Sequence, residues 1–189
     1  MTTIGFRREW DDDLHITLRT IDFSNLDAVV RMQVKYPHTL YVKSNAVSLA
    51  EAYVAQQQGK RILPFAIYAE QTLVGLVRIG YGRIRPKEPP VSDGNYHLWP
   101  FMLDEKWLDR GFERVVLELV LAYLHTEPLG PAQQVWTSIF PLSDEGTKLY
   151  MTLGFKRNGE YYGDDVVASR YLHAPADTRR VLEIEETSP

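Results

Sequence analysis

The sequence predicts a mixed α/β domain whose sheet is mostly antiparallel. Two β-rich runs, Leu63–Ala69 and Leu73–Tyr81, are separated by a short polar connection, which is typical of an antiparallel hairpin. The stretch Tyr96–Glu127 then passes from a strand-like run through a charged turn into a long amphipathic helix. Further β-rich runs follow that helix, so the pattern indicates antiparallel hairpins around one helical crossover.

The composition is that of one globular domain with a mild negative charge. The chain has 189 residues, 44% of them hydrophobic, which is enough to bury one sizeable core. A net charge of −4 and a pI near 5.7 argue against nucleic acid as the main partner, because nucleic-acid binders usually show a basic surface. The absence of cysteine excludes disulfides, thiolate metal sites and a cysteine nucleophile. The first residues lack the apolar segment of a signal peptide, and we expect a cytoplasmic protein without a membrane partner.

The N-terminal third of the chain predicts one strand and two helices. Leu14–Thr20 alternates apolar and polar residues, as a half-buried strand does. Helical spacing follows until Pro37, and a second helix is expected over Asn45–Gln58. Each helix has two candidate caps, Asp22 and Ser24 for the first and Ser44 and Ser48 for the second.

The central stretch contains a strand over Tyr96–Leu103 and the longest helix. Pro100 removes a ladder donor from the strand, so we expect a bulge or an unpaired edge there. After Gly111 the apolar residues recur at helical spacing, at Phe112, Val115, Val116, Leu119, Val120, Tyr123 and Leu124. The start of such a helix presents unpaired N–H groups and attracts anions.

The C-terminal part predicts a strand, a short helix and a hairpin. The strand is Gln134–Phe140, and the helix has Ser143 as its cap and Gly154 at its end. The hairpin pairs Phe155–Tyr161 with Val166–Leu172. Because the composition turns polar after this point, we expect one domain over residues 1–174 and a peripheral tail over residues 175–189.

This order of elements, with two sequence segments, resembles a known family. The segments are FMLDEKWLDRGFER and PLSDEGTKLYMTLGFKRNGE, with weaker support from LYVKSNAVSLAEAY. Over roughly residues 14–173 the chain is similar to the GNAT superfamily of acyl-CoA-dependent N-acetyltransferases, and most similar to the spermine/spermidine (diamine) acetyltransferase group. The resemblance implies a mixed, mostly antiparallel central sheet of about seven strands flanked by about four helices.

The resemblance places a pyrophosphate loop at the start of the long helix. Its first position falls on Leu108, its central glycine on Gly111, and its last small residue on Glu113. The implied cofactor-binding residues are Leu108, Asp109, Arg110, Gly111, Phe112, Glu113 and Arg114. Glu113 brings a negative charge to an anion site, which Arg110 and Arg114 would offset as phosphate partners. In the alternative, the acids are ordinary helix-start residues and the arginines are surface charges.

Five further residues match cofactor or catalytic positions of the family. The backbone of Phe101, Met102 and Leu103 matches the strand that pairs with the pantetheine arm of acetyl-CoA, and Ser143 stands where the family often has an asparagine. Tyr150 matches the general acid, a phenol that would protonate the departing thiolate. A core or ligand-lining tyrosine on a short helix is the alternative.

The base that takes the proton of the amine is not evident from the sequence. His97 lies on the strand before the cofactor residues and is a candidate, although a lone strand histidine is more often structural. Glu88 and Asp93 would attract a cationic acceptor unless they are solvated loop residues. The aspartate and arginine of the polyamine group fall on Trp99 and Pro100, which argues against a polyamine substrate.

These features predict an acyl-CoA-dependent N-acyltransferase that moves an acetyl group directly to a primary amine of a small molecule. Acetyl-CoA is the expected co-substrate, and no metal is expected because the five histidines form no short-spaced cluster. Direct transfer is favoured because neither a cysteine nor a Gly-x-Ser-x-Gly motif is present. The alternative is a non-catalytic GNAT-like domain for ligand binding or protein interaction. For partners we expect the amine acceptor and no nucleic acid, and we allow for a homodimer.

Overall fold

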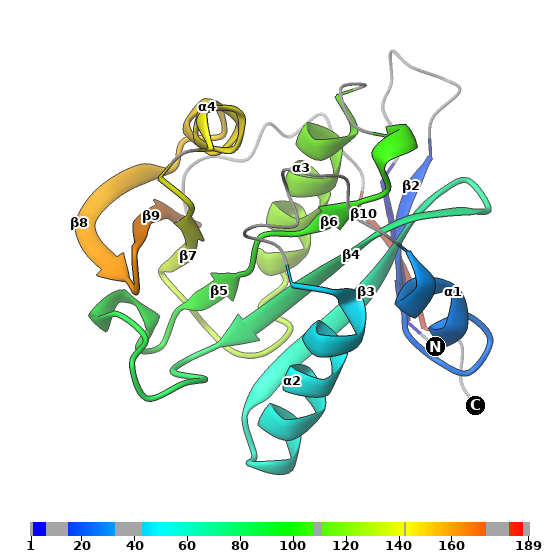
Figure 1. The fold of residues 1–189 in the computed structure, drawn as a ribbon, viewed down its shortest axis with the longest axis horizontal. Helices are drawn as coiled ribbons and strands as arrows, with labels where there is room; N and C mark the ends of the chain where they lie inside the picture. Colours follow the sequence, from blue (N-terminus) through cyan, green and yellow to red (C-terminus); the bar gives the residue numbers. More distant parts are fainter. Residues whose placement is uncertain are drawn as a thin grey trace.

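One mixed sheet organises the protein (Figure 1). The computed structural model describes residues 2–6, 15–32, 43–107, 111–141, 143–172 and 182–186. Within these residues ten strands form the order β10-β1-β2-β3-β4-β5-β7-β9-β8, and β6 pairs with β4 beside this path. All pairings are antiparallel except the parallel pair β5 and β7. The predicted fold class is confirmed, with more strands than expected.

The strands and helices agree with the sequence prediction over Leu14–Leu172. The strands are β1 (Thr2–Phe6), β2 (Ile16–Thr20), β3 (Arg61–Ala69), β4 (Thr72–Tyr81), β5 (Tyr96–Leu98), β6 (Met102–Leu103), β7 (Gln134–Ile139), β8 (Lys156–Tyr162), β9 (Asp165–Tyr171) and β10 (Leu182–Glu186). The helices are α1 (Leu26–Arg31), α2 (Asn45–Gln57), α3 (Phe112–Leu124) and α4 (Asp144–Thr152). Each helix that the sequence predicts is present, but the first ends at Arg31, whereas the sequence predicts helical spacing as far as Pro37; residues 33–37 lie outside the described part of the chain.

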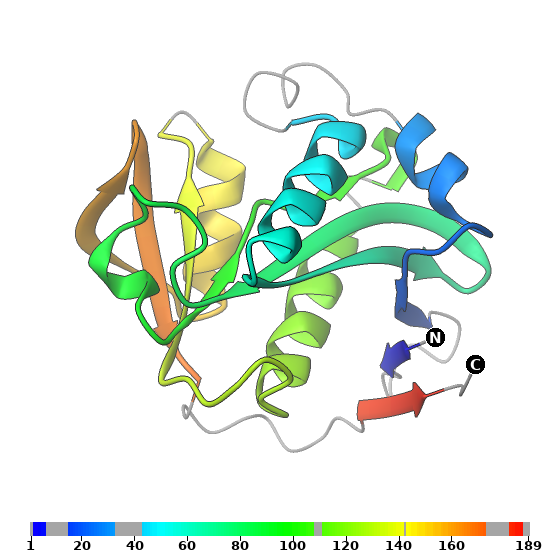
Figure 2. The same ribbon diagram turned by 90° about the horizontal axis from the view of Figure 1, so that it is seen from below.

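The helices cover opposite faces of the sheet. Alternation along β4 places Val77 and Ile79 in the same core as the apolar side of α3. Leu76 points to the other face, where it packs with Val29 of α1. α2 covers this second face as well, with Ala52 and Ala55 in one cluster with Trp99. Figure 2 shows α2 and α3 on opposite sides of the β3–β4 hairpin.

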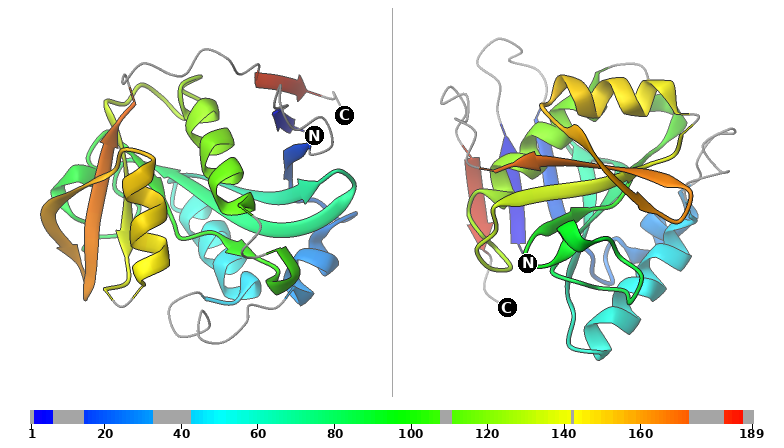
Figure 3. Two further views of the ribbon diagram at one scale, coloured as in Figure 1. Left: turned by 90° about the horizontal axis from the view of Figure 1, so that it is seen from above. Right: turned by 90° about the vertical axis from the view of Figure 1, so that its left-hand side faces the viewer.

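The two ends of the sheet are built differently. At one end the β8–β9 hairpin lies beside α4, and at the other end β1 and β10 pair antiparallel near both termini (Figure 3). β1 and β10 are not among the predicted strands, because residues near opposite ends of the chain supply the two halves of their ladder. Ile4 of β1 is fully buried. β10 belongs to the segment expected as a peripheral tail, and it lies at the outer edge of the sheet.

The predicted irregularity at Pro100 is confirmed. Leu98 is opposite Ile79 and Met102 is opposite Leu76, so four steps along one strand face three along the other. This extra residue is a bulge, and it divides the expected single strand into β5 and β6.

Candidate functional site

Two strands that begin as neighbours part in the middle of the sheet. β5 and β7 pair only through Tyr96 with Val135 and His97 with Trp136. After this point β6 stays beside β4, whereas β7 continues along β9. Figure 1 shows β6 and β7 diverging. In the described parts of the chain, the edges of β6 and the end of β7 that face each other are therefore unpaired, which leaves backbone groups for an extended ligand.

The backbone of β6 is held in place by a glycine of β4. A Cβ atom built on Gly75 would lie 2.3 Å from the carbonyl oxygen of Met102, so only glycine permits this approach. The N–H of Asp104 donates to the carbonyl of Val74, and N–H groups alternate in direction along a strand. The N–H of Leu103 therefore points away from β4, toward the opening. The cofactor role of Phe101, Met102 and Leu103 stays a prediction.

α3 begins shortly beyond β6, after a single 3₁₀ turn over Glu105–Trp107. Gly111 is its N-cap residue, with a left-handed φ of 77° that disfavours other residues. Phe112 is buried and contacts the ring of Trp107 edge-on at 4.9 Å between centroids, which fixes the first turn. Gly111 has no side chain with which to cap this 13-residue helix, and the N–H groups of such a first turn attract anions.

The side chains of the first turn differ from the predicted phosphate cradle. Arg114 donates from Nε to Oε1 of Glu118 at 2.9 Å, four residues along the same helix. Its guanidinium is therefore engaged with α3 and not directed to the helix start. Glu113 is half-buried in the first turn. Leu108, Asp109 and Arg110 lie outside the described residues, and their roles stay predictions.

α4 approaches the opening from the same face as α3. Ser143 is its N-cap residue, and its hydroxyl accepts from the N–H of Gly146 at 3.3 Å. A Cβ atom at position 146 would lie 2.6 Å from that hydroxyl, so glycine makes this cap possible. The side chain of Ser143 is thus engaged within its own helix.

Tyr150 lies at the base of the opening. Its ring is buried with 6% of the residue exposed and meets Phe155 edge-on. Burial raises the pKa of Tyr150 to about 12, with the hydroxyl of Thr137 acting in the opposite direction. Thr137 belongs to β7 and comes directly after the last pair that joins β7 to β5. At neutral pH the phenol is protonated, so it is able to donate a proton beside the parted strands.

His97 is buried in the short ladder that pairs β5 with β7. It has no exposed surface, and its ring stacks on Trp136 at 3.6 Å and lies 3.8 Å from the ring of Trp99. Burial lowers the pKa of His97 to about 4, against the nearby carboxylate of Glu88. A substrate does not reach this ring in the structure, and the structural alternative describes His97 better than the base.

Both acidic loop residues have partners within the protein. Glu88 is 2% exposed and accepts from the N–H of Ile84 at 2.7 Å. Asp93 forms a bidentate ion pair with Arg83, in which Nη2 of Arg83 donates to Oδ2 of Asp93 at 2.9 Å. The geometry supports local structural roles for both.

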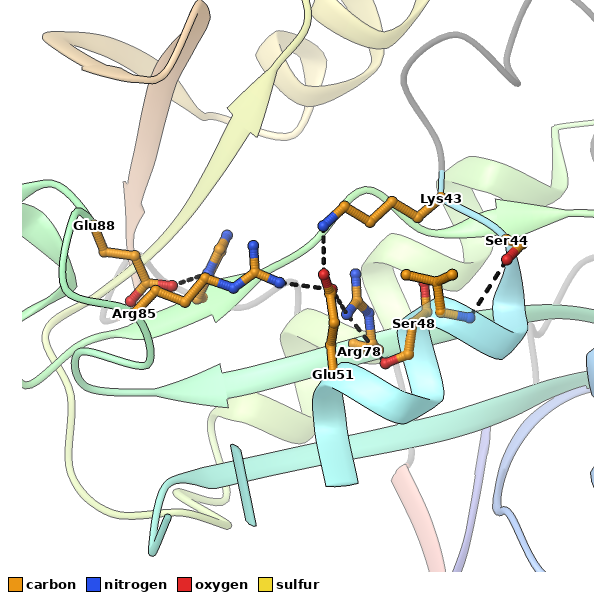
Figure 4. A network of polar contacts seen from close by, with 9 residues as sticks. Lys43, Ser44, Ser48, Glu51, Arg78, Arg85 and Glu88 are labelled. Atoms are coloured by element: carbon orange, nitrogen blue, oxygen red, sulfur yellow. Dashed lines mark hydrogen bonds and ion pairs between the residues drawn. The ribbon is translucent and has the colours of Figure 1, made fainter. Parts of the chain in front are cut away.

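A charged cluster that the sequence does not reveal lies on the α2 face of the sheet (Figure 4). Glu51 of α2 contacts three cations, which are Lys43, Arg78 and Arg85. We call these four residues the Glu51 cluster. One signal exists in the sequence, because Arg78 is a lone charge within the apolar strand LVGLVRIGY. The convergence of Lys43 and Arg85 on the same carboxylate depends on the fold.

None of the helices among the described residues is long and apolar enough to cross a membrane.

The chain is similar to known acetyltransferases in sequence and in fold. No protein-family model matches it. A spermine/spermidine N(1)-acetyltransferase of Bacillus subtilis is 24% identical over 147 residues, which cover 78% of this chain and 91% of the relative. A spermidine N-acetyltransferase from Vibrio cholerae, solved with CoA and spermine, has a TM-score of 0.59 at 16% identity and covers 82% of this chain and 94% of that one.

An aminoglycoside acetyltransferase solved with coenzyme A has a TM-score of 0.64 at 15% identity, again over 82% of this chain and 94% of that one. The resemblance seen in the sequence is confirmed by these relatives. The chain has the fold of the GNAT N-acetyltransferases, and its sequence is similar to that of a spermine/spermidine acetyltransferase.

Proposed function

We propose that this protein transfers the acetyl group of acetyl-CoA directly to a primary amine of a small molecule. The observation that supports it most is the parting of β6 from β7 with the protonated phenol of Tyr150 at its base. An extended pantetheine arm fits this opening because its amides would pair with backbone groups of β6, such as the N–H of Leu103. The diphosphate would then meet the first amides of α3 beyond the end of β6.

Each part of the opening has one chemical task. The backbone of β6 orients the thioester, which turns a bimolecular encounter into a positioned reaction. After the amine attacks the carbonyl carbon, the C–S bond breaks and Tyr150 gives its proton to the departing thiolate. The resulting phenolate regains a proton from solvent. The amine must lose a proton before attack, and the burial of His97 leaves solvent or another side chain to accept it.

The relatives support this function and its cofactor. Coenzyme A is present in the solved aminoglycoside and spermidine acetyltransferases that share the fold. Both act on amines by their names, as does the relative from Bacillus subtilis. A small-molecule amine is therefore the acceptor that we propose here.

A second candidate is a domain that keeps the fold without efficient cofactor binding. The pairing of Arg114 with Glu118 and the carboxylate of Glu113 in the first turn of α3 favour it, because neither helps an anion. Calorimetric titration with acetyl-CoA, with CoA as comparison, separates the two candidates. Saturable binding followed by acetyl transfer to amines supports the enzyme, whereas no binding at millimolar ligand would leave the second candidate.

A further inference from the structure

The Glu51 cluster lies where an acceptor would approach the thioester, if the proposed function holds. Tyr150, α3 and α4 hold the cofactor side of the opening. In direct transfer the amine must come to the acyl carbon from the side that the cofactor leaves free. That side is the face covered by α2, to which Arg78 points because its neighbours Val77 and Ile79 point to α3.

Arg78 also lies at the position along β4 that is opposite the start of the bulge. The N–H of Trp99 donates to its carbonyl at 3.3 Å, at the residue where β5 ends and the bulge begins. Its guanidinium lies 5.1 Å from the centre of the Trp99 ring. A Cβ atom on Gly80 would lie 2.7 Å from the same ring, so Trp99 is pressed against β4 beside Arg78. The cluster therefore borders the point where the strands part.

The cluster has more positive than negative charge. Arg78 contacts Oε2 of Glu51 at 3.2 Å and Arg85 contacts the same oxygen at 2.6 Å, while Lys43 contacts Oε1. Figure 4 shows Lys43 and Arg85 reaching Glu51 from different sides. One carboxylate is thus shared by three cations, in a chain whose net charge is −4. Glu88 lies three residues after Arg85, and its N–H donates to the carbonyl of Arg85 at 3.2 Å, but its carboxylate contacts Ile84 and His97 and no member of the cluster.

Arg78 is the buried cation of the cluster and has Glu51 as its counter-ion, so the charge of the two more exposed cations is left for solvent or a further anion. The side chain of Arg78 is only 9% exposed, and its other partner is the carbonyl of Ser48 at 3.3 Å. Burial lowers the pKa of its guanidinium, the hydrogen bond and charge of Glu51 act in the opposite direction, and the charge of Arg85 adds to the lowering. Arg85 and Lys43 keep 35% and 50% of their side-chain surface exposed, so both reach a ligand from solvent. A carboxylate or phosphate would complete the charge balance with charge-assisted hydrogen bonds.

We propose that the acceptor is a primary amine that carries an anionic group, a carboxylate or a phosphate, and that Arg85 and Lys43 bind this group while Arg78 and Glu51 position them. A polyamine is cationic at each nitrogen, so the positive cluster repels it. The specificity of this protein then differs from the polyamine named for its relatives from Bacillus subtilis and Vibrio cholerae. This inference deepens the proposed function and rests on it.

Matched acceptors test the role of the anionic group. Lysine and cadaverine differ only by a carboxylate, and O-phosphoethanolamine and ethanolamine differ only by a phosphate. In at least one pair, we expect the compound that carries the anionic group to be acetylated with at least about tenfold higher kcat/KM. This ratio corresponds to one charge-assisted hydrogen bond. The pair that shows the difference identifies the anion. Equal use of both members in both pairs, or faster acetylation of cadaverine and spermidine, would overturn the proposal.

A matched variant tests the cluster itself. Arg85→Gln should raise KM for the preferred acceptor about tenfold and leave the affinity for acetyl-CoA unchanged. Arg83→Gln makes the same charge change two residues away, in an arginine that pairs with Asp93, and should change KM much less. Circular dichroism melting checks that both variants fold, and Lys43→Gln replaces Arg85→Gln if that variant does not. Equal effects of the Arg85 and Arg83 substitutions would contradict the proposal.

Calorimetry separates failure of this inference from failure of the proposed function. If acetyl-CoA binds and only polyamines are acetylated, the proposed acetyltransferase function is supported and the proposal of an anionic acceptor is overturned. If acetyl-CoA does not bind, titration with glutarate still tests the cluster. Binding of glutarate that is lost in Arg85→Gln and kept in Arg83→Gln supports an anion site, and binding that is equal in all three proteins overturns it.

Discussion

At the scale of single residues, burial decides the chemistry of Tyr150 and His97. The first is a buried acid that keeps its proton, and the second is a buried base that stays without one. Both are named as candidate catalytic residues by the sequence. The fold distinguishes them, because Tyr150 lies beside Thr137 at the opening, whereas His97 is enclosed by tryptophan rings.

Replacing Tyr150 by phenylalanine should lower turnover much more than cofactor affinity. The ring keeps its contact with Phe155, and only the proton donor is removed. General acid catalysis contributes about 10²-fold or more, so kcat should fall by that order while the Kd for acetyl-CoA changes little. Steady-state kinetics and calorimetry measure the two quantities. Tyr53→Phe, in an exposed tyrosine of α2, is the control, and an unchanged kcat in Tyr150→Phe would remove this residue as the acid.

Glu113→Gln should tighten the binding of acetyl-CoA several-fold. The substitution removes a negative charge from the first turn of α3, where we propose that the diphosphate lies. The gain should shrink in high salt, because salt screens a partly exposed charge. Glu127→Gln changes the same charge beyond the other end of α3 and should have little effect. Equal or weaker affinity of Glu113→Gln would mean that the carboxylate points away from the phosphates.

The protein should lose stability in weak acid because of His97. The pKa of His97 is lowered to about 4 in the folded state from its ordinary value of 6.5, so the unfolded chain binds a proton first as the pH falls. The free energy of unfolding should therefore decrease between pH 6.5 and pH 4 by on the order of 3 kcal/mol from this group, and be unaffected by it above pH 6.5. His97→Gln should lack this part of the decrease in urea titrations. Parallel pH profiles of the two proteins would contradict the assignment.

At the scale of elements, the position of β6 depends on one glycine. Gly75 lets the backbone of β4 approach Met102, and Gly80 on the same strand makes room for Trp99 on the α2 face. The two glycines therefore support the cofactor side and the acceptor side of the opening separately.

Gly75→Ala should lower stability and weaken acetyl-CoA binding together. The added methyl group collides with the carbonyl of Met102 and must push β6 from β4, at a cost of about 1–3 kcal/mol. Gly80→Ala should lower stability by a similar amount but change acetyl-CoA affinity much less. Urea unfolding and calorimetry on both variants check this. If Gly75→Ala binds acetyl-CoA as tightly as the unchanged protein, the backbone of β6 does not hold the cofactor.

At the scale of the whole molecule, local sequence patterns predict the elements but not the contacts between distant ones. The long apolar spacing of α3 and the hairpins between Leu63 and Leu172 are visible in the sequence because they depend on neighbouring residues. Pro100 similarly predicts the bulge. β1 and β10 are not visible, because residues near opposite ends of the chain supply the two halves of one short ladder.

The residues of the candidate site also divide into those that a local sequence motif names and those that only the fold brings together. Tyr150, Gly111 and the backbone of Phe101–Leu103 are named from local motifs of the resemblance, and their roles in the site stay predictions. The Glu51 cluster is assembled from α2, β4 and two loops, so no window of the sequence contains it. The pairing of Arg114 with Glu118 also changes the predicted phosphate site, since the two residues are helix neighbours that satisfy each other.

The short seam between β5 and β7 also has a mechanical consequence. Among the described residues, two residue pairs join β5 to β7, and the rings of His97 and Trp136 stack on each other there. A long ladder resists bending, whereas a short one acts as a hinge, so we expect the β7–β9–β8 part to rock against the β2–β3–β4 part about this seam. A ligand laid between the strands would stiffen that motion, and release of product would require it.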